Sequence, residues 1–276
     1  MSKILVVDDD PIVYEVIQKA LAAEGHALRY APDGQHGLQL LAEEAADLVI
    51  ADLTMASTGE FKFLKQLSRD YRNVRCLVMV GSAAPEASIA ALREHICDFL
   101  AKPFTVEELH EAINSALTGC PATAIEVVSA LPEWVELRVP CDLAAVSPLQ
   151  RLFTRLAADL SQPACEAIGY AFREMLNNAI EHGCKLNPQQ RVEVRYMRLK
   201  HAVICLIKDP GEGFDPARLD HAAINNPSDD PVRHIFARGE KGMRAGGFGI
   251  LLTQQMVDEL IYNERHNEIL FVKYLL

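Results

Sequence analysis

Short apolar runs alternate with amphipathic segments five times between residues 1 and 118, and this alternation constrains the fold more than any other feature. Apolar residues at three- and four-residue steps indicate helices, whereas short apolar runs bounded by turn residues indicate buried strands. Repeated strand–helix units predict an α/β fold, with a doubly wound parallel five-stranded sheet. Its functional crevice is expected at the carboxyl ends of the strands. The expected strands are 4–7, 27–31, 48–51, 76–80 and 99–101, and the expected helices are 11–23, 34–43, 61–68, 86–94 and 106–117.

Polar residues whose side chains could bind a metal or take part in a reaction follow four of these strands. They are Asp8, Asp9 and Asp10 after the first strand, Asp52 after the third, Ser82 after the fourth and Lys102 after the fifth. Converging carboxylates repel one another, so a divalent cation with oxygen ligands is expected between them, and Lys102 adds a positive charge. Singly, each residue is also explained by an ordinary turn or loop start. Their order at successive strand ends favours a site.

The segments VVDDD, IADLTM, VGSAA and LAKPF, with their spacings, resemble the receiver domain of two-component response regulators. The resemblance implies that Asp52 accepts a phosphoryl group from a sensor histidine kinase and that Lys102 pairs with the phosphoryl oxygens. It also implies a switch formed by Ser82 and Phe99, and a cis bond between Lys102 and Pro103. The implied Mg²⁺ ligands are Asp8, Asp9, Asp52 and the carbonyl of Thr54. Ala56 departs from the family, which usually has proline there.

The first domain is expected at residues 1–118, a linker at 119–130 and a second domain at 131–276. The proposed linker is rich in small residues and carries Glu126 as its one charge. A strand is expected at 134–139, where polar and apolar residues alternate. No basic helix-turn-helix follows, so a DNA-binding output domain is not expected.

The segment 166–183, EAIGYAFREMLNNAIEHG, predicts one helix with an apolar face. Glu174 and Asn178 stand one turn apart along the rim of that face. A carboxamide oxygen suits Mg²⁺, and a neighbouring carboxylate can orient or deprotonate a nucleophile. Taken alone, the pair is also explained as the polar margin of a packed helix.

Two glycine-containing segments follow. Strands are expected at 191–197 and 202–208, and the second leads into Asp209, Gly211 and Gly213. Glycine removes side chains where a large planar group must approach the backbone. The loop 225–245 carries several basic residues and suits a mobile flap over phosphates. Gly246, Gly247 and Gly249 then precede an apolar helix, whose N-terminus would offer backbone N–H groups to an anion.

In this order, EMLNNAIEHG, KDPGEGFD and RAGGFGILL resemble the nucleotide-binding boxes of the GHKL ATPase superfamily, and most of all its anti-sigma-factor serine kinases. The resemblance implies an α+β GHKL ATPase sandwich that binds ATP. Asn178 would ligate Mg²⁺, Glu174 would act as the base or orient the acceptor hydroxyl, and Asp209 would bind the adenine amino group. The residues implied to line adenine and phosphates are Gly211, Gly213, Gly246, Gly247 and Gly249.

Composition limits the location and partners. The formal net charge of −11 argues against nucleic acid as the main partner. No run of 18 apolar residues and no signal peptide occur, so a soluble cytoplasmic protein without membrane contact is expected. The 7 cysteines form no C-x-x-C pair and are expected as reduced thiols.

These features favour a response regulator whose phosphorylation at Asp52 controls an ATP-dependent protein serine kinase. Its expected substrate is a STAS-domain antagonist of an anti-sigma factor. The alternative is a non-catalytic ATP-binding module that sequesters a sigma factor or antagonist. A hybrid histidine kinase is less favoured, because no histidine-bearing helix pair separates the two halves. A homodimer is compatible with either hypothesis. The sign of the control, the partner and the cognate sensor kinase stay open.

Overall fold

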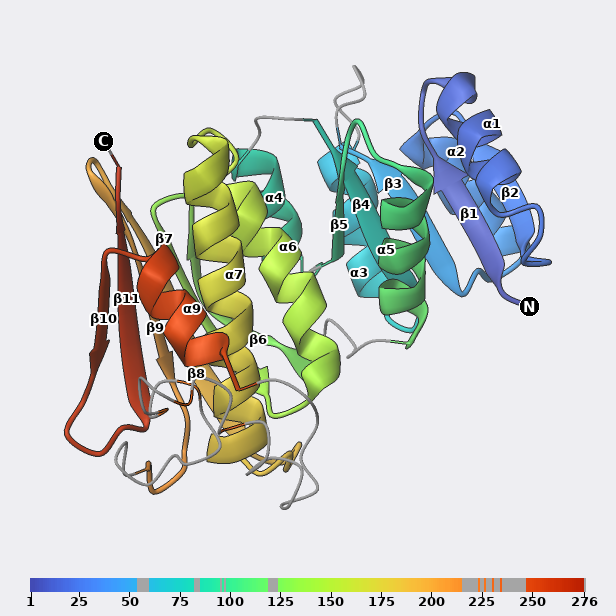
Figure 1. Ribbon diagram of the computed structural model, residues 1–276. Coiled ribbons are helices and arrows are strands. Elements are labelled where there is room, and N and C mark those ends of the chain that lie inside the picture. The colour runs from blue at the N-terminus through green and yellow to red at the C-terminus, as the bar shows by residue number, and fades with distance from the viewer. Residues whose placement is uncertain are drawn as a thin grey trace. The chain divides into compact units, whose positions relative to one another are not determined.

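The computed structural model of the chain forms two compact units (Figure 1). One unit contains Met1–Pro132 and Ser147–Asp159, and the other contains Glu133–Val146 and Leu160–Leu276. The structure describes residues 1–53, 60–81, 85–94, 96, 98–118, 124–214, 223, 226, 230, 234 and 247–275. Within these ranges, no helix is long and apolar enough to span a lipid bilayer.

The first unit contains a parallel five-stranded sheet with the order β2-β1-β3-β4-β5. The predicted doubly wound fold is therefore confirmed. The strands are β1 (Lys3–Val7), β2 (Ala27–Ala31), β3 (Leu48–Asp52), β4 (Arg75–Val80) and β5 (Asp98–Ala101). The helices between and after them are α1 (Pro11–Ala20), α2 (Gly34–Glu43), α3 (Glu60–Asp70), α4 (Pro85–Arg93) and α5 (Val106–Thr118).

The period of two along each strand divides the apolar residues of this sheet between its faces. Ile4 and Val6 of β1 belong to a core cluster with Ile17 of α1 and Leu109 of α5. Val7 points to the opposite face, because a side chain at Gly37 of α2 would meet it. Both faces are thus covered by helices, which explains why the strands are apolar runs without polar alternation.

Two elements C-terminal to the expected receiver boundary belong to the first unit. They are β6 (Glu126–Leu131) and most of α6 (Val146–Leu156). The second half of the expected linker is therefore a strand. Arg93 of α4 donates two hydrogen bonds, at 2.9 and 2.7 Å, to the carbonyl oxygen of Ala130 in β6. A short segment of small residues gives no period by which this strand could be predicted.

Five strands of the second unit pair antiparallel with one another, in the order β10-β11-β9-β8-β7. The strands are β7 (Trp134–Pro140), β8 (Arg191–Leu199), β9 (Ala202–Lys208), β10 (Glu259–Tyr262) and β11 (Glu268–Tyr274). Two helices, α7 (Gln162–Asn178) and α9 (Gly249–Met256), lie together on one face of this sheet (Figure 1). This arrangement is the predicted α+β sandwich.

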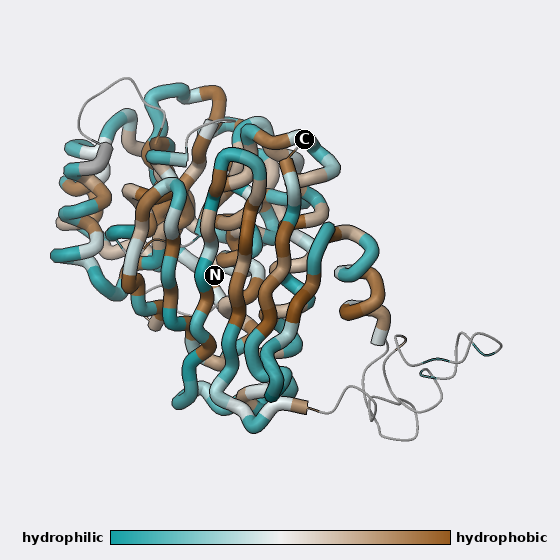
Figure 2. The backbone as a smooth tube through the Cα atoms, turned by 90° about the vertical axis from the view of Figure 1, so that its left-hand side faces the viewer, coloured by the Kyte–Doolittle hydropathy of each residue, from teal (hydrophilic) through white to brown (hydrophobic). Residues whose placement is uncertain are grey.

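Buried and exposed residues alternate along the strands of this second sheet, which explains why helices cover only one of its faces. Val135, Leu137 and Val139 of β7 are fully buried, whereas Trp134, Glu136 and Arg138, which alternate with them, are partly or fully exposed. In Figure 2 the middle of the strands is apolar and the turns at their ends are hydrophilic. A sheet with one packed face and one solvated face is typical of antiparallel strands.

The long helix α7 differs from its prediction at both ends. It begins at Gln162, four residues before the expected start, with Pro163 in its first turn. Beyond Asn178 the chain does not continue as an α-helix but forms a π-helical turn, Ala179–Gly183. The amide of Cys184 donates to the carbonyl of Ala179 at 2.8 Å, five residues back. Such single π turns are frequent at functional sites.

The prediction of reduced thiols is wrong for one pair of cysteines. Cys141, directly after β7, and Cys184, directly after the π turn, form a disulfide with a Cα–Cα distance of 6.0 Å. Both residues are buried. Their separation of 43 residues gives no local motif, so only the fold brings them together. Among the described cysteines, Cys76, Cys165 and Cys205 are thiols.

Candidate functional site

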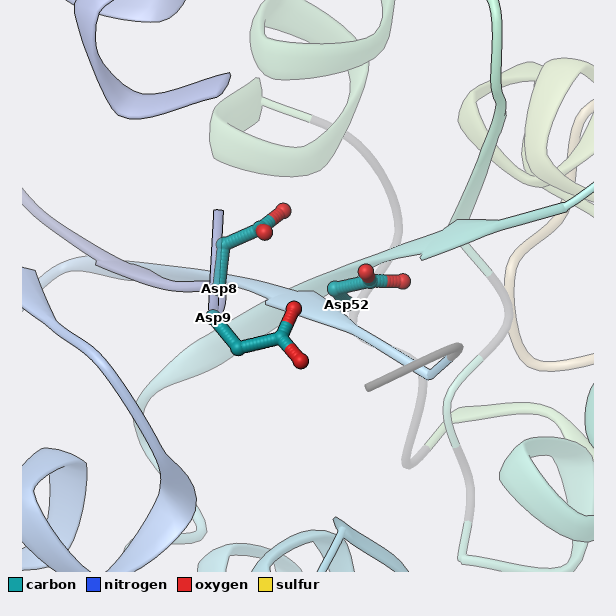
Figure 3. Close-up of side chains that lie close together, drawn as sticks. All are labelled: Asp8, Asp9 and Asp52. Carbon is teal, nitrogen blue, oxygen red and sulfur yellow. The ribbon is translucent and has the colours of Figure 1, made fainter. Parts of the chain in front are cut away.

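Three carboxylates gather at the carboxyl ends of β1 and β3, as the parallel sheet predicts (Figure 3). One carboxylate oxygen from each of Asp8, Asp9 and Asp52 lies within 4.8 Å of the others. Asp8 and Asp52 are buried, and Asp9 is exposed. Hard oxygen ligands at the mouth of a crevice, with one side open to solvent, fit Mg²⁺ together with its retained waters.

Lys102, directly after β5, joins two of these carboxylates. Its Nζ donates to Oδ2 of Asp8 at 2.7 Å and to Oδ2 of Asp52 at 2.8 Å. Burial alone would lower the pKa of Lys102, but the hydrogen bonds with Asp52 and Asp8 outweigh it, and the pKa is raised. Burial raises the pKa of Asp8, against the opposing effect of Lys102. The lysine therefore stays charged and partly neutralises the acidic cluster.

The resemblance to receiver domains also implied roles for the Lys102–Pro103 bond and for Phe99, Thr54 and Ser82. The bond between Lys102 and Pro103 is cis, as predicted. Phe99 is fully buried in β5. Thr54 and Ser82, the expected metal ligand and switch residue, lie outside the described residues. The roles assigned to Phe99 and Ser82 stay predictions.

Helix α6 makes contacts within this unit that were not foreseen from the sequence, one of them at the carboxyl end of β4. A guanidinium nitrogen of Arg155 donates to the carbonyl oxygen of Gly81, the residue that follows β4 and precedes Ser82. Arg151, one turn earlier, donates to Oδ1 of Asp98 at 2.6 Å and to Oγ of Ser115 at 2.8 Å. Burial lowers the pKa of Arg155 and raises that of Asp98. Arginine on an amphipathic helix gives no sequence signal for such contacts, because it is usually solvent-facing.

In the second unit, the rim of α7 meets the start of α9. Packing brings Glu174 so close to Gly249 that a Cβ at Gly249 would lie 2.5 Å from Oε2 of Glu174. Gly249 is the first residue of α9. Asn178 follows Glu174 by one turn and is half-buried. The predicted carboxylate thus lies beside a helix N-terminus, where backbone N–H groups favour phosphate.

Asp209, at the end of β9, lies against the π turn that follows α7. A Cβ at Gly183 would overlap the carboxyl group of Asp209, so only glycine permits this approach. The backbone amide of Gly211 donates to Oδ1 of Asp209 at 2.8 Å. Burial raises the pKa of Asp209, against the effect of this bond. Gly183 was not among the predicted site residues, and one glycine after a helix normally signals only a helix end.

The remaining predicted glycines serve different structural needs. Gly213 has a φ of +84°, and a Cβ there would overlap the carbonyl oxygen of Arg265. Gly247 also has a positive φ, and its carbonyl accepts a hydrogen bond from the amide of Ala223 at 2.8 Å. Gly246 and most of the basic loop 225–245 lie outside the described residues. Gly213 is therefore required by a close backbone approach.

Comparisons with known protein families agree with this architecture. Residues 4–114 match the model of the response regulator receiver domain. Residues 139–273 match the model of the histidine kinase-like ATPase domain. Each match contains one of the two groups of residues described above.

Curated relatives match this chain over part of their length. The transcriptional regulatory protein GlrR of Escherichia coli K12 is 26% identical over 197 residues, which cover 70% of this chain and 44% of GlrR. The response regulator MprA of Mycolicibacterium vanbaalenii is 33% identical over 115 residues, which cover 42% of this chain and 50% of MprA. The chain thus spans half or less of the length of these relatives.

Among solved structures, a response regulator receiver domain protein from Clostridium thermocellum is 27% identical, with a TM-score of 0.40. The match covers 42% of this chain and 94% of that protein. With the acidic cluster inside one matched family and the Glu174, Asn178 and Asp209 group inside the other, the chain joins a response regulator receiver domain to a histidine kinase-like ATPase domain of the GHKL type.

Proposed function

We propose that this chain is a response regulator whose output is an ATP-dependent protein serine kinase. The observation that carries the proposal is the placement of Glu174 against Gly249 at the N-terminus of α9. A helix N-terminus is a site for phosphate, and a carboxylate beside it can act on a hydroxyl that attacks that phosphate. A carboxylate and a phosphate repel each other, so an acidic group at this position favours a role in the transfer over a role in nucleotide binding alone.

In the proposed reaction, ATP supplies the phosphoryl group, and its Mg²⁺ is held with the help of Asn178. Glu174 takes the proton of a serine hydroxyl while the serine oxygen forms its bond to the γ-phosphorus and the bond to ADP breaks. Asp209 orients the adenine through its amino group. Phosphoryl transfer depends mainly on positioning and charge neutralisation, so these few residues are sufficient.

The receiver is proposed to regulate this reaction. A sensor histidine kinase donates a phosphoryl group to Asp52, with Mg²⁺ held by Asp8 and Asp9 and the new charge balanced by Lys102. The hydrogen bond between Arg155 of α6 and the carbonyl of Gly81 supports a path for the signal. After residues 157–161, α6 is followed by α7, which carries Glu174 and Asn178. The proposed partner is a STAS-domain antagonist of an anti-sigma factor.

Radiolabelled ATP tests the proposal directly. Purified protein and ATP labelled at the γ position are added to a lysate of the source cells, and Asn178→Ala serves as the control. We expect acid-stable phosphoserine on one small protein, absent with Asn178→Ala. Acid-labile label would indicate histidine chemistry and would contradict a serine kinase. Nucleotide binding without any label would favour the non-catalytic, sequestering module.

Glu174→Gln separates catalysis from binding. The substitution keeps the size of the side chain but removes the base, so transfer should fall about 100-fold or more while ATP affinity changes little. Glu166→Gln is the matched control, because Glu166 is exposed on the same helix and bonds to Gln162. Transfer at the wild-type rate by Glu174→Gln would show that Glu174 is not the base.

A further inference from the structure

The loop that carries Asp209, residues 209–214, is held by a neighbouring turn. No sequence motif indicated this turn. This turn, residues 263–267, connects β10 to β11. The amide of Asp209 donates to the carbonyl oxygen of Asn267 at 3.0 Å. Nδ2 of Asn267 donates to the carbonyl oxygens of Asp209 and Gly211, each at 3.2 Å. One residue thus binds the loop through both its backbone and its side chain.

Asn263 fixes the orientation of the Asn267 side chain. Nδ2 of Asn263 donates to Oδ1 of Asn267 at 2.9 Å, and Oδ1 of Asn263 accepts from the amide of Asn267 at 3.1 Å. With its oxygen engaged by a donor, the Asn267 side chain must present its NH₂ group to the loop. Its two bonds to the loop carbonyls therefore have a defined direction.

Ring contacts join the same two segments. Phe214, directly after Gly213, packs edge-on against Tyr262 at a centroid distance of 5.6 Å and lies 5.3 Å from the ring of His266. Such aromatic contacts add to the hydrogen bonds and to the close backbone approach at Gly213. The far end of the Asp209 loop is thus also attached to the turn.

The consequence concerns the carboxylate of Asp209. Gly211 engages Oδ1 through its amide, and the position of Gly211 depends on its carbonyl bond to Asn267. The direction of Oδ2 of Asp209 is then set by a loop that is attached to the turn near Asp209 through Asn267 and at its far end through Phe214. We propose that Asn267 is a positioning residue that sets the nucleobase specificity of the ATP site by orienting Asp209 toward the adenine amino group. This inference rests on the proposed binding of ATP.

Asn267→Asp tests the assignment. It preserves shape but replaces the NH₂ donor with an oxygen facing two carbonyls. Binding of ATP is compared with binding of ITP, which has a carbonyl in place of the adenine amino group. We expect wild-type protein to prefer ATP, and the variant to lose about tenfold or more in ATP affinity but little in ITP affinity. If Asn267 had only a structural role, the substitution would lower the affinities for ATP and ITP by the same factor.

Two further variants keep the test decisive. Asn263→Asp leaves Asn267 intact but removes the donor that orients it, so the preference for ATP should fall by a smaller factor. Asn114→Asp introduces the same charge at an exposed position of α5 and should leave the preference unchanged. An unchanged ATP-to-ITP ratio in both Asn267→Asp and Asn263→Asp would overturn the inference. Failure of the wild-type protein to bind ATP would instead overturn the proposed function on which it rests.

Discussion

Asp8, Asp9 and Asp10 are adjacent in the sequence but differ in their surroundings. Asp8 is buried and accepts from Lys102, whereas Asp9 is exposed and completes the group of three carboxylates. Asp10 is the N-cap of α1, where its Oδ1 accepts from the amide of Ile12 at 2.9 Å. A run of like charges is thus divided between a cation site and a helix cap, which limits their mutual repulsion.

A methyl group at Gly183 should disturb the ATP site through Asp209. The Cβ of Gly183→Ala would overlap the Asp209 carboxyl group, so the π turn or the Asp209 loop must move. We expect a loss of ATP affinity of about tenfold or more, measured by titration calorimetry. Gly25→Ala is the control, because no atom lies within 4 Å of its new Cβ. Its positive φ should cost about 1–2 kcal/mol of stability without changing ATP affinity. Equal ATP binding by Gly183→Ala and wild type would contradict the placement of Asp209.

At the scale of secondary structure elements, predictability follows periodicity. The strands of the receiver are continuous apolar runs, so their ends, and with them Asp52 and Lys102, could be placed from the sequence. The π turn follows α7 directly after Asn178. No pattern of apolar residues reveals this change of helix type. Asn267 could not be foreseen, because it acts through a turn between two strands whose pairing is set by tertiary packing.

The disulfide between Cys141 and Cys184 connects β7 to the π turn beside Asp209. Closing a loop of this length restricts the unfolded chain, so its reduction should lower the free energy of unfolding by about 2–4 kcal/mol. Chemical denaturation with and without dithiothreitol measures this difference. The double variant Cys141→Ser, Cys184→Ser should unfold at the same denaturant concentration in both conditions. Wild-type unfolding that does not respond to the reductant would show that the two thiols are not bonded in solution.

At the scale of the whole molecule, the boundary between the two matched families is not the boundary between the two compact units. The ATPase match begins at residue 139, yet Ser147–Asp159 belongs to the unit that contains the receiver sheet. Helix α6 is therefore part of the ATPase family by sequence and part of the receiver unit by its contacts. Arg151 and Arg155 supply two of those contacts. Under the proposed regulation, α6 is the element expected to carry a change at the receiver site along the chain to α7.

Beryllium fluoride, which mimics a phosphoryl group on Asp52, should change the rate of partner phosphorylation in the wild-type protein. A phosphorylation-induced shift of Gly81 would move the carbonyl to which Arg155 is bonded, and α6 is expected to follow. Arg155→Gln should therefore reduce the response while leaving the ATP affinity of the untreated protein near its wild-type value. Arg69→Gln is the matched control, because Arg69 is an exposed residue of α3 that pairs with Asp70. A full response in Arg155→Gln would exclude this bond as the route of the signal. No response in the wild-type protein would show that Asp52 does not control the ATPase domain.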